Sequence, residues 1–274
     1  MSAAKILMLF DNMNRDYVAR LSSGAERQAR LSGGAVETVN LYGSDRSLAQ
    51  VIDETGPAGV ILTAPPSDDR HMMLELERRS LPFARIAAML DPGRGINVTM
   101  DEYEAARSIT EKLALAGHTK IGIIRGPRTH LSSMRRYNGF TAALGAKGVK
   151  LEPSMVVEGE YDRASGAEVG DKLIASGVTA VFASNDAMAA GFIDAARRAG
   201  KRVPQDISVI GFDDDPIARN MTPQLTSVRQ PLEDMGAKAY ELLLAAIGGA
   251  GSATASAEIS FEIVERASVA SPPG

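Results

Sequence analysis

The chain has 274 residues, of which 45% are hydrophobic and 23% are charged, with 30 basic and 34 acidic side chains and no cysteine. This length suits one large domain or two modest ones, and it provides enough core to fold without a disulfide or a metal ion. The missing cysteine excludes disulfide frameworks, thiolate metal sites and cysteine nucleophiles. The net charge of −4 argues against a strongly basic nucleic-acid-binding face on this chain.

The start of the chain carries one lysine and a short apolar run from Ile6 to Phe10. A secretory signal would need a longer apolar stretch and a small-residue cleavage site, and a membrane helix needs roughly 20 apolar residues. We therefore expect a cytoplasmic protein with no membrane partner.

Short apolar segments recur along the chain, each bounded by Gly, Pro, Asp or Asn. This pattern is typical of strands that are buried on both faces of a parallel sheet. The predicted strands are residues 5–10, 36–41, 59–62, 83–87, 120–124, 180–183, 207–212 and 259–264.

Segments with helical periodicity lie between these strands. Residues 101–117 carry an apolar stripe, begin with a capping-box pattern of Asp101 and Glu104, and end at Gly117. Residues 231–247 begin with Pro and end before a Gly pair. Alternating strands and helices predict an α/β architecture with right-handed crossovers. The spacing favours two doubly wound parallel-sheet lobes over one eight-fold barrel.

Residues that follow the strands are the candidates for a binding site, because doubly wound sheets bind ligands beyond the carboxyl ends of their strands. Carboxylate, amide and guanidinium groups stand there. They suit a neutral, polyhydroxylated ligand, since they accept from and donate to hydroxyls and Arg adds a two-pronged donor. These residues include Asp11, Asn14, Arg136, Asn185 and Asp213.

Each of these residues also has a purely structural interpretation. Asn185 and Asp186 open a helix, where such side chains are typical caps, and the acidic run 213–215 before Pro216 is typical of a turn. Arg136 near a helix start faces the unfavourable end of the helix dipole, so solvation alone explains it weakly. The residues by themselves leave both interpretations open.

Enzyme signatures are missing from the sequence. His71, His118 and His130 are far apart and lack metal-ligand spacing, and His118, which follows a helix-ending Gly, is more typical of a structural residue. There is no Gly-x-Ser-x-Gly elbow, and neither glycine-rich segment has the context of a phosphate loop. We expect no catalytic residue, no metal ion and no cofactor.

Five segments in register resemble the effector-binding region of LacI/GalR-type bacterial transcription repressors. They are GHTKIGIIRGP, RRYNGF, ASNDAMAAG, VPQDISVIGFDD and PQLTSVRQP. The resemblance covers essentially the whole chain. It implies the periplasmic-binding-protein-like type I fold, in which three crossovers join two lobes and a ligand is held between them. The implied lobes are residues 4–116 with 230–249, and residues 117–229 with 257–270.

The resemblance also implies which residues contact the effector. Arg136 and Asp213 match the family's hydroxyl-binding Arg and Asp, and Asn185 matches its ligand amide. Tyr161 stands where a stacking aromatic is common, and Gln230 stands at the hinge. In the first lobe FDNMNRDYVARL departs from the family pattern, in which an Asn-Pro pair precedes the aromatics. The remaining candidates are Asp11, Asn14 and Tyr17 in the first lobe, and His130 and Phe212 in the second.

The function implied by the resemblance is the sensing of a small molecule, with a carbohydrate expected, by a homodimer or tetramer that controls operator DNA through a helix-turn-helix head. No such head precedes the first predicted strand, so we expect this chain alone not to bind operator DNA. The alternative is a periplasmic sugar-binding protein of a transport system with its signal removed.

Overall fold

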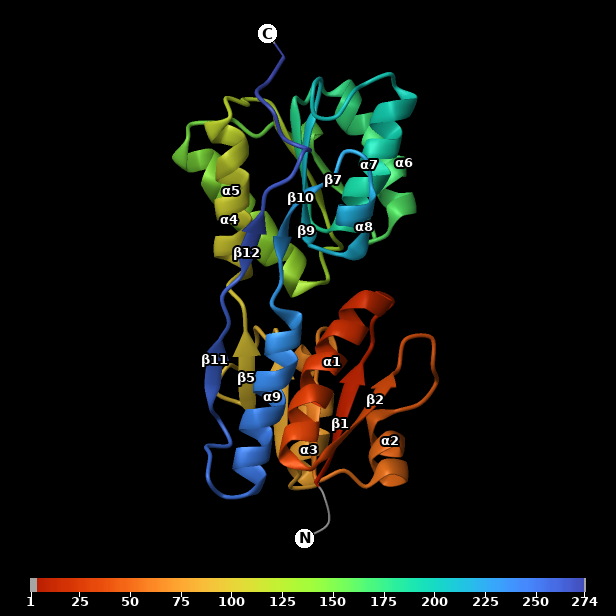
Figure 1. Ribbon diagram of the computed structural model, residues 1–274, viewed down its shortest axis with the longest axis vertical. Helices are drawn as coiled ribbons and strands as arrows, with labels where there is room; N and C mark the ends of the chain where they lie inside the picture. Colours follow the sequence, from red (N-terminus) through yellow and green to blue (C-terminus); the bar gives the residue numbers. More distant parts are fainter. Residues whose placement is uncertain (1–3, 274) are drawn as a thin grey trace. The chain divides into compact units, whose positions relative to one another are not determined.

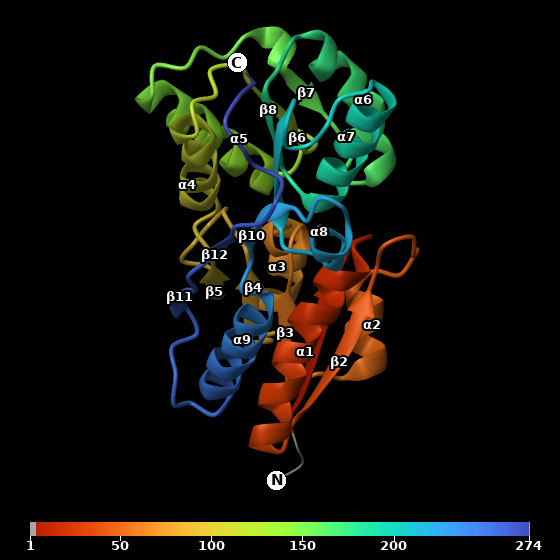
Figure 2. The same ribbon diagram turned by 45° about the horizontal axis from the view of Figure 1, so that its top comes forward.

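The computed structural model describes residues 4–273, which divide into two compact units. Unit 1 contains the residues up to Met100 together with Pro231–Ser260, and unit 2 contains Asp101–Gln230 together with the residues from Phe261 onward (Figures 1 and 2). Within the described residues the chain therefore passes from one unit to the other three times, and each unit contains one six-stranded sheet.

Unit 1 is built on a parallel sheet with the strand order β2-β1-β3-β4-β5-β11. Helices α1 and α9 pack against each other, and α2 and α3 contribute to the apolar cluster that covers β1 and β3. The strands are β1 (Lys5–Phe10), β2 (Ala35–Asn40), β3 (Gly59–Leu62), β4 (Phe83–Ile86), β5 (Ile96–Thr99) and β11 (Ser256–Glu258). The helices are α1 (Arg15–Ser32), α2 (Leu48–Thr55), the 3-10 turn η1 (Pro66–Asp68), α3 (Arg70–Arg78) and α9 (Leu232–Ile247).

Unit 2 repeats this plan with the order β7-β6-β8-β9-β10-β12, in which only β12 runs antiparallel to its neighbour. Helices α4 and α5 pack as one pair, and α6 and α7 pack as another. The strands are β6 (Ile121–Arg125), β7 (Val156–Glu158), β8 (Ala180–Ala183), β9 (Ser208–Asp213), β10 (Thr226–Arg229) and β12 (Glu262–Val264). The helices are α4 (Glu102–Leu115), α5 (Leu131–Ala146), η2 (Pro153–Met155), α6 (Arg163–Ala175), α7 (Asp186–Arg198) and α8 (Pro216–Asn220).

Glycines let the paired helices touch at their backbones. A Cβ atom added at Gly24 of α1 would lie 1.8 Å from the carbonyl oxygen of Glu233 in α9. One added at Gly139 of α5 would lie 2.2 Å from the carbonyl oxygen of Tyr103 in α4. Since real Cβ contacts never come this close, a larger residue at either position would push its helix pair apart.

The two-lobe α/β fold predicted from the sequence is confirmed, but the lobe boundaries differ from those predicted. Residues 102–116 were expected in the first lobe, whereas α4 belongs to unit 2 because it packs against α5. The strand expected at 259–264 is replaced by two short strands. Of these, β11 pairs with β5 in unit 1 and β12 pairs with β10 in unit 2.

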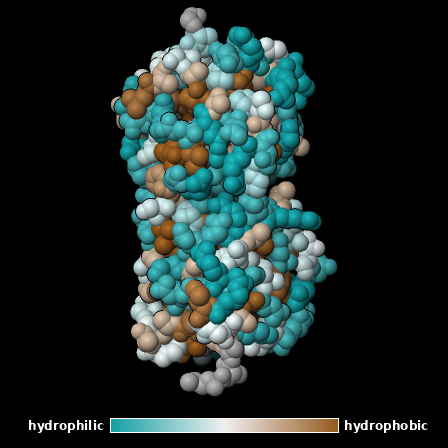
Figure 3. Space-filling model, viewed as in Figure 1, coloured by the Kyte–Doolittle hydropathy of each residue, from teal (hydrophilic) through white to brown (hydrophobic). Residues whose placement is uncertain are grey.

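Polar side chains, drawn in teal, cover most of the face shown in Figure 3, and apolar side chains form scattered patches on it. Within residues 4–273, no helix combines the length and the apolar character that crossing a membrane requires.

Candidate functional site

The carboxyl ends of five neighbouring strands meet at one edge of the unit 2 sheet, because β6 to β10 all run parallel. We call the segments that follow these strands the unit 2 edge. Such an edge is where doubly wound sheets bind ligands. Five residues predicted from the sequence stand there, each after a different strand: His130, Tyr161, Asn185, Asp213 and Gln230.

Arg136 of α5 is buried at this edge, with only 5% of it exposed. Its Nη1 donates to the carbonyl oxygen of Ser184 at 2.5 Å and lies 3.6 Å from Oδ1 of Asp213. Its Nη2 donates to Oε1 of Glu102, the first residue of α4, at 3.3 Å. The guanidinium carbon lies 3.8 Å from the centre of the Phe212 ring. Arg136 thus binds two carboxylates and stacks on an aromatic ring.

Burial on its own would lower the pKa of Arg136, but the Glu102 and Asp213 carboxylates outweigh it and raise the pKa, so the side chain stays charged. Around this group three buried polar atoms have no hydrogen-bond partner within residues 4–273: Oε2 of Glu102, Nε of Arg136 and Oγ of Ser184. Buried polar atoms are normally paired, so these three are suited to meet a bound molecule.

Asp213 ends β9 in an unusual backbone conformation. Its φ is +108° and that of Asp214 is +51°, a region that side-chain-bearing residues rarely adopt. The Oδ1 atom of Asp213 accepts a hydrogen bond from Nε2 of Gln230 at 2.6 Å. Strained backbone of this kind is held in place by its surroundings and is common at binding sites.

Asp186, which we considered as a helix cap, instead supports the loop after β9. Its Oδ1 accepts from the Ser227 hydroxyl at 2.6 Å, and its Oδ2 accepts from the backbone N–H of Asp215 at 2.8 Å. Burial, and then the carboxylate of Asp213, raise the pKa of Asp186 well above its usual range. Asp186 is therefore a structural partner of the strained loop.

Asn185 is the cap of α7, because its Oδ1 accepts from the backbone N–H of Met188 at 2.9 Å. Its Nδ2 donates to the carbonyl oxygen of Tyr161 at 2.8 Å, which ties the loop after β7 to the loop after β8. The sequence left open whether Asn185 is a helix cap or a ligand contact, and its side chain has one atom available for each role. Capping occupies the Asn185 oxygen, and the amide nitrogen faces the site loops.

Tyr161 is also held in the left-handed region, with a φ of +62°. Its ring lies 5.5 Å from the ring of His130, at an angle of 35°, and its hydroxyl lies 3.5 Å from Oγ of Ser132. Gly126 makes room for it, because a Cβ there would lie 2.1 Å from Cζ of Tyr161. Burial raises the pKa of Tyr161, so the hydroxyl stays protonated. Tyr161 and His130 form an aromatic pair at the unit 2 edge.

Phe212, a candidate effector contact in the sequence, lies in the core of unit 2. Its side chain is fully buried, between the Arg136 guanidinium and the ring of Phe182, whose centre is 6.5 Å away. Phe212 therefore packs against the Arg136 guanidinium on its core side. We do not propose it as an effector contact.

The first-lobe candidates stand at the carboxyl end of β1 in unit 1. Asp11 is exposed and Tyr17 is half-buried. Asn14 caps α1, since its Oδ1 accepts from the backbone N–H groups of Asp16 and Tyr17 at 3.0 and 3.2 Å. Capping accounts for this oxygen of Asn14. A role in effector binding stays a prediction for all three candidates.

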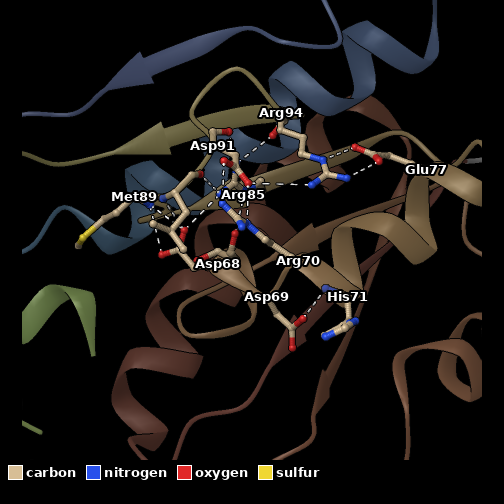
Figure 4. Close-up of polar contacts among 11 residues, drawn as sticks. Asp68, Asp69, Arg70, His71, Glu77, Arg85, Met89, Asp91 and Arg94 are labelled. Carbon is tan, nitrogen blue, oxygen red and sulfur yellow. Dashed lines mark hydrogen bonds and ion pairs between the residues drawn. The ribbon is translucent and has the colours of Figure 1, made fainter. Parts of the chain in front are cut away.

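A buried arginine organises the loop after β4 in unit 1 (Figure 4). Arg85 is fully buried; its Nε donates to the carbonyl oxygen of Ser67 at 2.7 Å, and its Nη1 donates to those of Asp91 and Arg94 at 2.8 and 3.0 Å. Its Nη2 lies 3.2 Å from Oδ1 of Asp68, which also accepts from the backbone of the same loop. Burial lowers the pKa of Arg85, and the Asp68 carboxylate opposes this.

The sequence analysis did not identify two charged residues, Glu102 and Arg85. Glu102 follows a helix-capping Asp, so its position is typical of a solvated first turn, and no local pattern connects it with Arg136. Arg85 lies inside an apolar segment. An arginine in a strand that is otherwise buried is the one signal that could have indicated a buried arginine bonded to a loop, here called the Arg85 clamp.

His118 holds the C-terminal segment in place, as its structural interpretation predicts. Its Nδ1 lies 2.9 Å from Oγ1 of Thr179, and its Nε2 lies 3.0 Å from Oγ of Ser208 and 2.9 Å from the carbonyl oxygen of Ala270. Across residues 4–273, no group of three or more His, Asp or Glu side chains is arranged to hold a metal ion.

Comparisons with known proteins agree with this architecture. Residues 110–269 match the family described as periplasmic binding protein-like domain. The chain is 32% identical over 239 residues to the HTH-type transcriptional regulator MalR of Streptomyces coelicolor, which covers 84% of this chain and 70% of that protein. It is 39% identical over 171 residues to the HTH-type transcriptional repressor PurR of Pasteurella multocida, covering 62% of this chain and 51% of that protein.

Solved structures show the same fold. A LacI family transcriptional regulator from Mycobacterium smegmatis superimposes with a TM-score of 0.86 and 26% identity, covering 97% of this chain and 99% of that one. A complex of the transcriptional regulator CelR with cellobiose also gives a TM-score of 0.86, at 24% identity, covering 98% of this chain and 86% of that one.

Proposed function

The chain belongs to the LacI family of transcription regulators and contains that family's effector-binding region, and from this premise we propose that its effector is a sugar held at the unit 2 edge. The observation that carries the proposal is the convergence of Arg136, Asp213, Asn185, Gln230 and Tyr161 on one edge of one sheet. Carboxylate, amide and guanidinium groups pair with hydroxyls, and the Tyr161 ring offers an apolar surface to the carbon-bound hydrogens of a sugar ring.

We propose that the regulator acts as a homodimer and that the effector changes its affinity for operator DNA. The effector favours whichever conformation of the regulator it contacts best, and the populations shift accordingly. The named relatives are transcription regulators, which supports this reading over that of a transport-system binding protein. Sedimentation analysis of the purified chain tests the dimer directly.

A thermal-shift screen against mono- and disaccharides, sugar acids and nucleobases tests the effector class. We expect at least one sugar to raise the melting temperature by several degrees, and Asp213→Asn and Gln230→Ala to abolish that rise. Asp206→Asn is the matched control, because Asp206 pairs with Arg202 at the exposed surface. A nucleobase that raises the melting temperature where no sugar does would overturn the proposed effector class.

A further inference from the structure

The Arg136 guanidinium lies close to two carboxylates. It lies 3.3 Å from the Glu102 carboxylate and 3.6 Å from the Asp213 carboxylate, and the exposed fractions of the Arg136, Glu102 and Asp213 side chains are 7%, 6% and 11%. The adjacent Arg135 is exposed and pairs with Asp101 instead. Glu102 and Asp213 therefore share the Arg136 guanidinium.

The Nη1 and Nη2 atoms of Arg136 each have a partner in the protein, whereas Nε has none within residues 4–273. Nη1 is directed at the Ser184 carbonyl and at Asp213, and Nη2 at Glu102. Recognition of a carboxylate or phosphate by arginine usually uses two parallel N–H groups of the guanidinium. Glu102 pairs with Arg136 through one contact, from Nη2 to Oε1 at 3.3 Å, and its carboxylate partly neutralises the charge to which a ligand anion would be drawn.

The unpaired oxygen of Glu102 requires a donor. Its Oε2 is buried and has no hydrogen-bond partner within residues 4–273. Leaving a buried charged acceptor unpaired is costly, so a ligand that brings a hydroxyl or an ammonium group gains from pairing with it. A ligand that brings another anion would instead meet a second buried negative charge at short range.

We propose that Glu102 is a specificity-determining residue of the effector site: its carboxylate pairs with Arg136 and keeps one buried oxygen without a partner, so that the site rejects sugar acids and sugar phosphates and accepts ligands that offer hydroxyl or ammonium donors. This inference rests on the proposed function, in that it assigns the ligand class of the same site. It adds to that proposal which sugars do not bind, namely sugar acids and sugar phosphates, and the residue responsible.

Inorganic phosphate tests the inference without knowledge of the effector. The melting temperatures of the wild type, Glu102→Gln and the double variant Glu102→Gln/Asp213→Asn are compared in phosphate and in chloride of equal ionic strength. We expect phosphate to raise the melting temperature of the wild type only by its general stabilising effect on folded proteins, to raise that of Glu102→Gln by about 2–4 °C more, and to raise that of the double variant further. Replacing Arg136 by Met in Glu102→Gln should remove the rise.

Glu104→Gln is the matched control, because Glu104 lies two residues away on α4 and pairs with Arg107 at the surface. It should respond to phosphate as the wild type does. A wild type that phosphate stabilises specifically, or a Glu102→Gln variant that phosphate does not stabilise, would overturn the assignment. The wild-type measurement stands even if the variants do not fold.

Matched sugars give the second measurement. Glucose and galactose are each compared with their amino sugar, uronic acid and 6-phosphate, and in the wild type only the neutral and amino forms should raise the melting temperature. A uronic acid or sugar phosphate that binds better than its parent sugar would overturn the role of Glu102. If no sugar of any charge binds, the proposed effector class fails, and the phosphate comparison still decides the role of Glu102.

Discussion

The guanidinium of Arg136 stacks on the ring of Phe212, 3.8 Å from its centre. The positive charge at the unit 2 edge is therefore in direct contact with the apolar core of the unit. An arginine that only touched a ligand would be solvated in the empty protein. Arg136 is buried among partners that belong to the protein itself, and this gives it a role in stability as well as in binding.

Arg136→Met is accordingly expected to destabilise the ligand-free protein by about 3–5 kcal/mol, because it leaves the Glu102 and Asp213 carboxylates buried without their cation. Urea unfolding measures the loss. Arg135→Met is the control, since that half-exposed side chain pairs with Asp101 at the surface and should cost less than about 1 kcal/mol. Equal unfolding midpoints for the two variants would contradict a structural role for Arg136.

Asp186→Asn tests the buried carboxyl group beneath the strained loop. The folded-state pKa of Asp186 is raised, so its contribution to stability is present at low pH and is lost as the pH rises through that pKa. Asn does not titrate, and the variant should therefore gain stability relative to the wild type as the pH rises from 4.5 to 7.5. The slope is at most about 1.4 kcal/mol per pH unit.

The control for this pH series is Asp194→Asn. The hydrogen bond from Arg163 lowers the pKa of Asp194, so its contribution to stability is present at neutral pH and is lost on acidification. Because the pKa of Asp194 lies below the ordinary value of 3.8, the difference in stability between this variant and the wild type should stay nearly constant from pH 4.5 to 7.5, unlike that of Asp186→Asn. Unfolding midpoints at three pH values distinguish the rising difference from the constant one, and a pH-independent difference for Asp186→Asn would be the contrary result.

Gly126→Ala tests the placement of Tyr161. The added methyl group would overlap the Tyr161 ring, which must move, at an expected cost of about 1–3 kcal/mol from overpacking. For a sugar identified by the screen, calorimetry should show affinity at least about tenfold weaker, as for Tyr161→Ala. The double variant should bind no worse than either single one, because both changes act through the same ring. Additive losses would show that Gly126 acts elsewhere.

Arg85→Met tests the clamp in unit 1. The variant removes the donors of several buried carbonyl groups and leaves Asp68 without its partner, so we expect a loss of at least about 3 kcal/mol. Hydrogen exchange of the amides in residues 88–95 should accelerate. Lys at this position should not restore stability, because an ammonium has three donors and no planar fork. The control is Arg70→Met, because Arg70 is exposed and pairs with Asp91.

The central strands of both units could be predicted from the sequence because burial on both faces requires uninterrupted apolar segments. GVIL and AVFA form β3 and β8 over the same residues that the pattern predicts. The strands INVT (β5), VVE (β7) and TSVR (β10) lie outside the pattern because they are short and carry polar residues. In β10 those residues are needed: Ser227 binds Asp186, and Arg229 binds Asp214.

The site could be predicted as far as strand ends reveal it. Asp213 follows the apolar segment 207–212, whereas Gln230 follows β10, which the pattern does not predict, and was assigned through the family resemblance; the two residues lie in hydrogen-bond contact. Glu102 could not be found in this way, because its partner Arg136 stands 34 residues further along the chain and only the packing of α4 on α5 brings them together. Phe212 shows the converse limit, since an aromatic at a strand end can face the core as readily as a ligand.

The chain crosses between the two units three times, and this sets the order in which a ribosome can complete the units. Strands β1 to β5 emerge first, but helix α9 and strand β11, which finish unit 1, follow only after most of unit 2 has been made. At about 5–20 residues per second, the intervening segment takes roughly 7–26 s to synthesise. During that interval the sheet face that α9 will cover is open to solvent. Unit 1 therefore reaches its final packing only after Pro231–Ser260 has been made, and deleting that segment should leave unit 1 incomplete.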